Sequence, residues 1–493
     1  MHTIGLRRML AAATLALFGG ATLFAGAAAA QAADGNINFD ARGSITLHKL
    51  EQPDALGEAA SGAEQDTSGM TPISGVEFTV APVNGTKDGT DLTNTPTGLQ
   101  DPANWDVIES LTAADVTLDT GKQVVSTVTD QQGVASFTDL PVGLYVVAET
   151  GTPDGVLAAD LFLVSIPTSV SGEWTYDLHV YPKNGIPGVE KTLDADSDAS
   201  AFGAGDELAW NVSGTVPALP ASADGKRMSY DKIEYVDELD ARLTFIAIRD
   251  AQAGGVALAE GTDYTVAQDG QRIVLTLTEA GREKFGAEKT SITYQVVTSV
   301  VSEERSPLGD GVISNQVSQH LSTNKQDTDI VTESGGPVTY WGEIYVGKVD
   351  GNNQKAIAGA EFQVFRTQAD AKTQSDPIAV NGVTTFTTGD DGAVRIVALN
   401  AGANNARTLW LVVTKSPAGY VAAKEPIQVE LTAGTATSNT KHSNTKHSNT
   451  KQESFDLPLT GSVGTALLAA TAAVLVGAGL AVGAWNRRRA SHR

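Results

Sequence analysis

The sequence predicts an all-β chain of three tandem immunoglobulin-like β-sandwich domains. Short runs of alternating apolar and polar residues, bounded by Gly, Pro, Asn and Asp, fill most of the chain, and Ser44–His48, Arg272–Leu277 and Ile344–Val346 are examples. Runs of this kind are typical of the strands of β-sandwiches. Helical periodicity is scarce, and 493 residues suit about three domains of ~150 residues each.

An internal repeat indicates that the first and third domains are related. Four segments recur in the same order. The pairs are Gly43–Lys49 with Gly342–Lys348, Ile73–Phe78 with Ile357–Phe362, Asp130–Gly133 with Gly389–Gly392, and Tyr145–Gly155 with Leu409–Gly419. The last pair aligns Glu149 with Val413. The middle stretch lacks these segments, so we expect a differently connected sandwich there.

Composition sets the expected domain boundaries. The first sandwich is predicted over 33–187, the middle one over 188–337 and the third over 338–440, with junctions at Pro182–Pro187 and Gly335–Pro337. A tandem five-residue duplication, Asn-Thr-Lys-His-Ser, begins at Asn439. Because so polar a segment supports no core, we predict a flexible polar stalk over 441–456.

Both ends of the chain carry apolar segments with basic flanks. Arg7 and Arg8 precede an apolar run that closes on the small-x-small site Ala30-Gln31-Ala32, which predicts a cleaved secretory signal over 1–32. An uncleaved anchor is the alternative. Residues 463–485 form a second apolar run, long enough for a transmembrane helix, and a basic tail follows over 486–493. The arginines of this tail predict that it stays in the cytoplasm.

Charge and cysteine content exclude several functions. The formal net charge is −24, so the chain should repel nucleic acid, and we expect no nucleic-acid partner. An exported protein commonly uses disulfides, but this chain has no cysteine. Any covalent reinforcement must therefore come from other chemistry.

The sequence offers no metal or cofactor site and no enzyme motif. Asp194, Asp196 and Asp198 resemble the start of a calcium loop, but such a loop needs glycine at its sixth position and glutamate at its twelfth. Ala199 and Gly205 stand there instead. The seven histidines show no metal-ligand spacing, and no nucleophile elbow or phosphate loop is present. We therefore expect no metal, no cofactor and no enzyme.

Three features together identify a resemblance. They are the Tyr-Pro-Lys-Asn motif that ends at Asn184, the segment around Glu149, and a C-terminal signal of Leu457, Pro458, Leu459, Thr460 and Gly461 before the apolar run and basic tail. The chain resembles the shaft (major) pilins of sortase-assembled Gram-positive pili, above all the actinobacterial fimbrial shaft subunits. The resemblance covers the whole chain. It implies sandwiches of the CnaA and CnaB types and a cell-wall-anchored surface fimbria, whose precursor the C-terminal helix holds in the plasma membrane.

The resemblance also implies how subunits are joined. A class C (pilin) sortase cleaves after Thr460 and transfers it to the amine of Lys183 on an identical subunit, which builds a head-to-tail polymer. Lys183 must therefore be exposed and must reach its neutral form. A minor tip pilin, and peptidoglycan attached by a housekeeping sortase, are further implied partners, and a host or bacterial surface receptor stays open. The alternative is a monomeric wall-anchored adhesin that binds a glycan or protein.

Similar pilins also carry Lys–Asn isopeptide bonds inside their domains, formed next to a buried acid. Burial disfavours both charged forms, so the amine becomes a nucleophile and the acid stays protonated. The matching residues of the middle domain are Lys191, Asn315 and, as the acid, Asp237. Glu234, Glu238 and Asp240 remain competitors for the acid.

The other two domains match the pattern less fully. In the first, the resemblance implies a triad of Lys49, Glu149 and Asn184. In the third, Lys348 matches, with Asn439 as the favoured partner ahead of Asn444 and Asn449. Val413 stands where the family has its glutamate, and valine cannot shuttle a proton. That departure puts the third bond in doubt.

Overall fold

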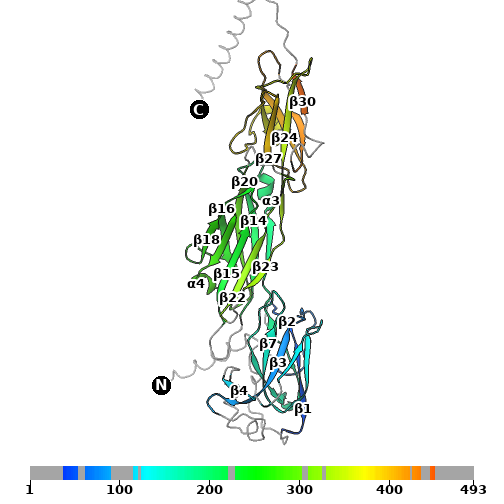
Figure 1. Ribbon diagram of the computed structural model, residues 1–493, viewed down its shortest axis with the longest axis vertical. Coiled ribbons are helices and arrows are strands. Elements are labelled where there is room, and N and C mark those ends of the chain that lie inside the picture. Colours follow the sequence, from blue (N-terminus) through cyan, green and yellow to red (C-terminus); the bar gives the residue numbers. More distant parts are fainter. Residues whose placement is uncertain are drawn as a thin grey trace, which may run out of the picture.

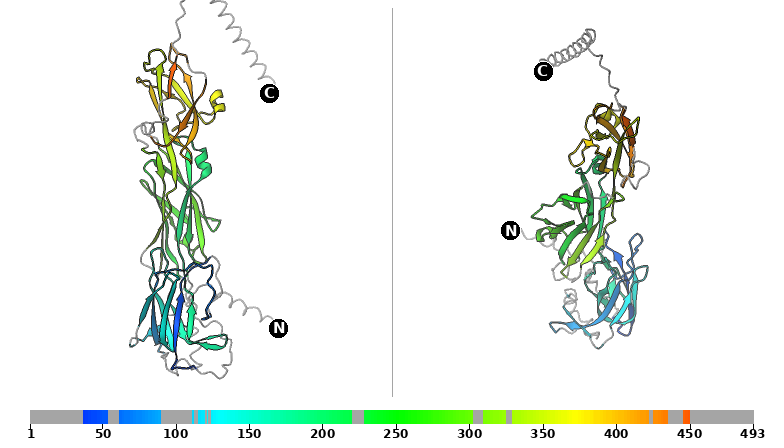
Figure 2. Two further views of the ribbon diagram at one scale, coloured as in Figure 1. Left: turned by 90° about the vertical axis from the view of Figure 1, so that its right-hand side faces the viewer. Right: turned by 45° about the horizontal axis from the view of Figure 1, so that its top comes forward.

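The computed structural model describes residues 37–53, 61–89, 111, 115–119, 121, 124–219, 228–301, 309–324, 329–421 and 425–434, and the backbone of 445–449. Three β-modules follow one another along an elongated molecule (Figures 1 and 2). Strands predominate and the helices are few and short, so the all-β prediction is confirmed. The predicted signal peptide, sorting signal, transmembrane helix and basic tail lie outside the described residues. Within the described part, no helix is long and apolar enough to cross a membrane.

The first module contains twelve strands, β1 to β12. They are β1 (Arg42–His48), β2 (Leu50–Glu51), β3 (Glu77–Thr86), β4 (Val116–Leu118), β5 (Val125–Val128), β6 (Val134–Pro141), β7 (Gly143–Gly151), β8 (Phe162–Ile166), β9 (Thr168–Val170), β10 (Glu173–Thr175), β11 (Asp177–Val180) and β12 (Lys183–Asn184). Its two larger sheets have the orders β11-β1-β6 and β4-β3-β7-β8, with β5 paired to β3, and two small sheets pair β9 with β10 and β2 with β12. Ile45, Phe78 and Phe137 are buried in the core of the module.

The middle module contains β13 to β23 and two short helices. They are β13 (Gly188–Leu193), α3 (Ala195–Ser200), β14 (Glu207–Val216), β15 (Tyr230–Glu238), β16 (Leu243–Ala253), β17 (Val256–Ala257), β18 (Tyr264–Asp269), β19 (Arg272–Leu277), α4 (Glu279–Arg282), β20 (Thr290–Val300), β21 (Val312–Ser314), β22 (Val317–Thr323) and β23 (Ile330–Glu333). Two five-stranded sheets, β13-β14-β20-β16-β17 and β18-β19-β15-β22-β23, enclose a core around Trp210.

The third module contains β24 to β30 and α5. The elements are β24 (Val338–Asp350), β25 (Glu361–Phe365), α5 (Gln368–Thr373), β26 (Phe386–Thr387), β27 (Ala393–Asn400), β28 (Arg407–Lys415), β29 (Ile427–Leu431) and β30 (Thr445–Asn449). The sheets are β21-β24-β27, with β30 parallel to β24, and β26-β25-β28-β29. Strand β21 thus crosses from the middle stretch, and one continuous core serves both modules.

The first and third modules share their connections, as the repeat predicts. In each, the first long strand pairs in parallel with a strand from the end of the module, β1 with β11 and β24 with β30. Each first strand also carries an irregularity in its antiparallel pairing at the same place, between Gly43 and Ile45 and between Gly342 and Ile344. The described strands β13 to β20, β22 and β23 of the middle module pair with one another in antiparallel fashion. The middle module is therefore connected differently from the first and third modules, as its sequence predicts.

The acidic turn that resembles a calcium loop has a structural role. Asp194 caps α3 by accepting a hydrogen bond from the backbone N–H of Ser197, an arrangement that satisfies a free helix N–H group. Asp198 is buried, and its side chain accepts hydrogen bonds from Thr339 and Asn400 of the third module. These carboxylates stabilise the helix and the junction between modules.

Strand β30 differs from the expectation of a stalk. Composition predicts an unstructured segment over 441–456, yet Thr445–Asn449 pairs with Val346–Asp350 of β24. Low hydrophobicity argues against a core, but the backbone groups along β24 still gain from a hydrogen-bonded partner strand. A polar segment can provide that partner, because pairing uses the main chain.

Candidate cross-linking sites

The first module brings all three predicted residues of its triad together. Lys49 follows β1, Glu149 lies in β7, and Asn184 ends β12. The ammonium of Lys49 donates hydrogen bonds to Glu149 Oε1 and Asn184 Oδ1. Asn184 Nδ2 donates to Glu149 Oε2 at 2.8 Å, and the backbone N–H of Ala159 donates to the same oxygen at 2.9 Å. Lysine, carboxylate and carboxamide therefore contact one another inside a buried pocket.

Strand β12 consists of two successive residues, Lys183 and Asn184, whose side chains point to opposite faces. Lys183 pairs with Leu50 of β2, and Asn184 pairs with Glu51. Because successive side chains of a strand point to opposite faces, the two neighbours face opposite ways. Asn184 is 1% exposed and meets Lys49, while Lys183 is half-buried.

The segment before Lys183 is anchored at several points. Tyr181 is buried, stacks on His48 with 4.7 Å between ring centroids, and accepts a hydrogen bond from the backbone N–H of Gln65. The carbonyl of Pro182 accepts the backbone N–H of Leu50 at 3.1 Å. Partial desolvation lowers the pKa of Lys183, so more of its amine is neutral than in free lysine.

The middle module brings Lys191 of β13 into contact with Asp237 of β15. The two belong to opposite sheets, and their buried side chains meet in an ion pair. Burial lowers the pKa of Lys191 to about 8 and raises the pKa of Asp237, while the attraction within the pair opposes both shifts. Since one proton can move from the Lys191 ammonium to the Asp237 carboxylate, the pair can also exist as a neutral amine beside a neutral carboxylic acid.

The three competing acids of this module are engaged elsewhere. Thr276 donates a hydrogen bond to Glu234 at 3.1 Å. Glu238 pairs with Arg272, also at 3.1 Å, and Arg242 binds Asp240 at 2.7 Å. The geometry therefore favours Asp237 as the acid beside Lys191.

Asn315 lies between β21 and β22 and is 1% exposed. It comes two residues before Val317, which pairs with Asp237. Its Oδ1 and Nδ2 atoms and Oδ1 of Asp237 have no hydrogen-bond partner within the described structure. Buried polar atoms without partners cost about 1–3 kcal/mol each. No hydrogen bond joins Asn315 to Lys191 within the described residues. The two are related through Asp237, which contacts Lys191 and pairs with Val317, two residues after Asn315.

The third module buries its lysine in the same surroundings. The backbone N–H of Lys348 donates to Gly392 at 2.7 Å, as that of Lys49 does to Gly133. These glycines have φ values of 71° and 73°, and a Cβ would come within 2.6 Å and 2.5 Å of the lysine carbonyl, so only glycine fits. Burial lowers the pKa of Lys348 to about 8, as it does for Lys49.

One aromatic ring lies beneath each buried lysine. The Nζ atoms of Lys49 and Lys348 lie 5.6 and 5.7 Å from the ring centroids of Phe78 and Phe362. Trp210 holds the corresponding place at 5.9 Å from Lys191. Sequence patterns alone give these rings no role, although the repeated Glu-Phe pair that ends at Phe78 and at Phe362 marks two of them. Nothing in the sequence around Trp210 marks it in that way.

Strand β30 bears on the choice among the three candidate asparagines for Lys348. Asn439 and Asn444 lie outside the described residues. In β30, His447 pairs with Lys348 and Asn449 with Asp350. In the first module Asn184 pairs with Glu51, which is also two residues after the lysine. Asn449 therefore holds the register position of Asn184.

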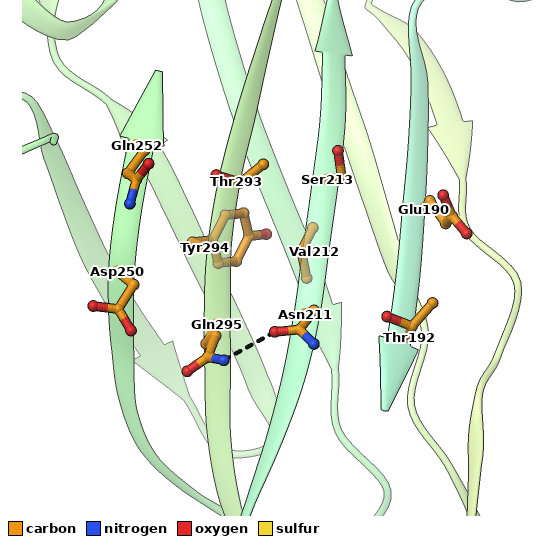
Figure 3. Close-up of a pocket in the computed structure, with 10 residues that line it drawn as sticks. All are labelled: Glu190, Thr192, Asn211, Val212, Ser213, Asp250, Gln252, Thr293, Tyr294 and Gln295. Carbon is orange, nitrogen blue, oxygen red and sulfur yellow. Dashed lines mark hydrogen bonds between the residues drawn. The ribbon is translucent and has the colours of Figure 1, made fainter. Parts of the chain in front are cut away.

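A polar hollow of about 370 Å³ lies on the β13-β14-β20-β16 sheet (Figure 3). It is lined by Glu190, Thr192, Asn211, Val212, Ser213, Asp250, Gln252, Thr293, Tyr294 and Gln295. Gln295 donates a hydrogen bond to Asn211 at 2.9 Å across it. The hollow carries two carboxylates from different strands and no nucleophile paired with a base. It offers no chemistry comparable to the lysine sites.

The fold and the lysine sites define a class, a protein of tandem β-sandwiches with buried lysines set beside amide and carboxyl groups. Family models match the three parts in turn: a Gram-positive pilin subunit D1, N-terminal domain, over 40–185; an Sgo0707 N2 domain over 190–334; and a prealbumin-like fold domain over 342–446.

Individual relatives point the same way. The chain is 33% identical to fimbrial subunit type 2 of Actinomyces naeslundii, over 96% of this chain and 95% of that protein. It is 30% identical to fimbrial subunit type 1 of Actinomyces viscosus, over 99% of both. Among solved structures, the major pilin SpaD of Corynebacterium diphtheriae has a TM-score of 0.64 at 26% identity, covering 85% of this chain and 99% of that one. The fimbrial protein FimP of Actinomyces oris has a TM-score of 0.51 at 27% identity, covering 85% and 100%. The chain belongs to the family of Gram-positive fimbrial subunits, the pilins.

Proposed function

We propose that this protein is the repeating shaft subunit of a covalently polymerised cell-surface fimbria. The observation that carries the proposal is the anchored presentation of Lys183, on the opposite face of β12 from the buried Asn184. Sortase cleaves after Thr460 and holds it as a thioester. The amine of Lys183 on the next subunit attacks this carbonyl, the thiolate leaves, and an isopeptide bond joins the two subunits. The resulting fimbria supports adhesion and biofilm formation, and the chain supplies the substrates but is not an enzyme.

Internal isopeptide bonds reinforce the subunit, with Lys49 bonded to Asn184 and Lys191 to Asn315. In each, the neutral amine attacks the carboxamide carbon, the adjacent acid polarises the carbonyl oxygen, and ammonia leaves. A pKa of about 8 raises the neutral fraction of each amine at pH 7 to about one in ten, from about one in several thousand for free lysine. In the middle module, loss of Nδ2 from Asn315 also removes one of the unpartnered buried atoms.

The experiment that tests polymerisation replaces Lys183 with alanine. We expect the high-mass ladder of wall extracts to disappear from a denaturing gel, because the nucleophile is lost while the fold keeps Asn184. Lys355→Ala is the matched control, since Lys355 is exposed and takes no part in the proposed chemistry. A ladder that persists in Lys183→Ala would contradict the proposal and would favour a monomeric adhesin whose high-mass forms arise from other proteins.

The same proposal names its assembly partners by chemistry. A pilin-specific sortase of class C forms the joint, identical subunits and a minor tip pilin share the polymer, and a housekeeping sortase links the last Thr460 to peptidoglycan. The apolar run over 463–485 and the basic tail over 486–493 hold the precursor in the plasma membrane until sortase cleaves the signal over 457–461. A host or bacterial surface receptor would be a further partner of the assembled fimbria.

A further inference from the structure

The first and third modules build nearly the same pocket around a lysine. Both lysine nitrogens lie over a phenylalanine ring, and both lysine carbonyls accept a hydrogen bond from an isoleucine N–H, that of Ile73 at 2.9 Å and that of Ile357 at 3.0 Å. Lys49 and Lys348 are each 0% exposed. Because the surroundings match so closely, any remaining difference isolates what the chemistry requires.

That difference lies on the strand facing the lysine. Phe78 pairs with Glu149, and Phe362 pairs with Val413, so the two residues hold the same register position. Glu149 contacts both Lys49 and Asn184. Val413 is 5% exposed and has no group that can bind or release a proton. The Nζ atom of Lys348 accordingly has no hydrogen-bond partner in the described part of the chain.

Asp350 is another carboxylate on the strand of Lys348, and it is held by hydrogen bonds from Asn352 and Tyr420. It is 2% exposed, and its oxygens accept hydrogen bonds from the backbone N–H of Asn352 at 2.7 Å and the hydroxyl of Tyr420 at 2.9 Å. Its counterpart by position in the first module is Glu51, which takes no part in the triad. Position 350 therefore does not replace position 413.

We propose that Val413 leaves the third module without a cross-link, so that Lys348 stays an unreacted buried amine, with Asn449 of β30 as the register counterpart of Asn184. An acid at position 413 would complete the site. The Nζ atom of Lys348 would then form a bond to the carboxamide carbon of Asn449, and the bond between that carbon and Nδ2 of Asn449 would break. Nδ2 would leave as ammonia, with its protons relayed by the new acid. This inference rests on the proposed chemistry of the first two modules, and it names the residue that decides where that chemistry operates.

The test is a peptide map of the full chain, secreted by a host without sortase, as wild type and as Val413→Glu. In wild type we expect cross-linked peptides joining Lys49 to Asn184 and Lys191 to Asn315, and a linear peptide containing Lys348. In Val413→Glu we expect most of Lys348 to become joined to Asn449, with the loss of one further ammonia. Val413→Gln, which has the same size but no acid, should stay linear.

Two further variants fix the partner and the acid. Val413→Glu combined with Asn449→Ala should return Lys348 to its linear form, and a bond formed instead with Asn444 would overturn the register argument. A wild-type chain already cross-linked at Lys348 would overturn the proposal, and Asp350→Asn would then show whether Asp350 is the acid. A folded Val413→Glu chain that stays linear would also overturn it. Failure of the proposed internal cross-links is distinguishable, because Lys49 and Lys191 would then be linear in the same map.

Discussion

The first and third modules place a lysine at the same point of the same fold, and they differ in what faces it. Lys49 meets Glu149 and Asn184, whereas Lys348 faces Val413. Strand alternation and the tight glycine turn suffice to bury a lysine and to lower its pKa. Strand alternation and the glycine turn do not supply an acid that can transfer a proton. The comparison shows that the buried nucleophile and the acid are encoded separately, so one substitution can leave the pocket intact and silence its chemistry.

The largest expected effect of this difference is mechanical. Load that enters a subunit at Lys183 and leaves through Thr460 passes through the middle and third modules. Without a bond to β30, the third module should unfold under tension and lengthen by the ~100 residues after Lys348, on the order of 350 Å. Single-molecule stretching of wild-type fimbriae should show this step. Val413→Glu should remove the step, and a wild-type fimbria without it would contradict the comparison.

A smaller effect is expected when the first module is made to resemble the third. Glu149→Gln keeps the size of the side chain but removes its acid, so the bond across the 135 residues between Lys49 and Asn184 should not form. Without the bond the unfolded chain is no longer closed into a loop of that length. The chain-entropy model predicts that the free energy of unfolding then falls by about 5 kcal/mol. Denaturant unfolding of the wild-type and Glu149→Gln chains measures it. A mutant that still loses the ammonia would show that the acid is dispensable.

The smallest expected effect is the pH dependence that the unreacted amine of Lys348 contributes to stability. The pKa of Lys348 is about 8 in the folded module against 10.5 for free lysine, so the unfolded state holds the proton more tightly. Stability should therefore rise as pH increases from about 8 to 10.5, by about 3 kcal/mol. Lysines already converted to amides cannot contribute to this rise. Lys348→Met should flatten the profile in that window, and equal slopes in both chains would contradict it.

The sequence predicts the β-modules and their repeat because both depend on local patterns. Alternation marks the strands, and the segments around Lys49 and Lys348 recur at matching intervals. In the structure the two repeated segments form matching strands, β1 and β24. Each strand has an irregularity in its antiparallel pairing at the same place, after Gly43 and after Gly342. Burial of both lysines follows from the same alternation.

Long-range placement could not be predicted in this way. Four acids lie close together around Asp237, and only the fold shows that three of them pair with other residues. The repeated Asn-Thr-Lys-His-Ser segment offers three asparagines with identical neighbours, and backbone pairing alone distinguishes Asn449. Asp198 looks like a surface acid, yet it is buried because another module covers it. Each of these outcomes depends on contacts between residues far apart in the chain.

The central claim is tested most directly by sequencing the branched peptides released from purified wild-type fimbriae. We expect a peptide in which the carbonyl of Thr460 is bonded to the ε-amine of Lys183, recovered from nearly every subunit. Thr460 bonded to a different lysine, or found only on peptidoglycan, would contradict it.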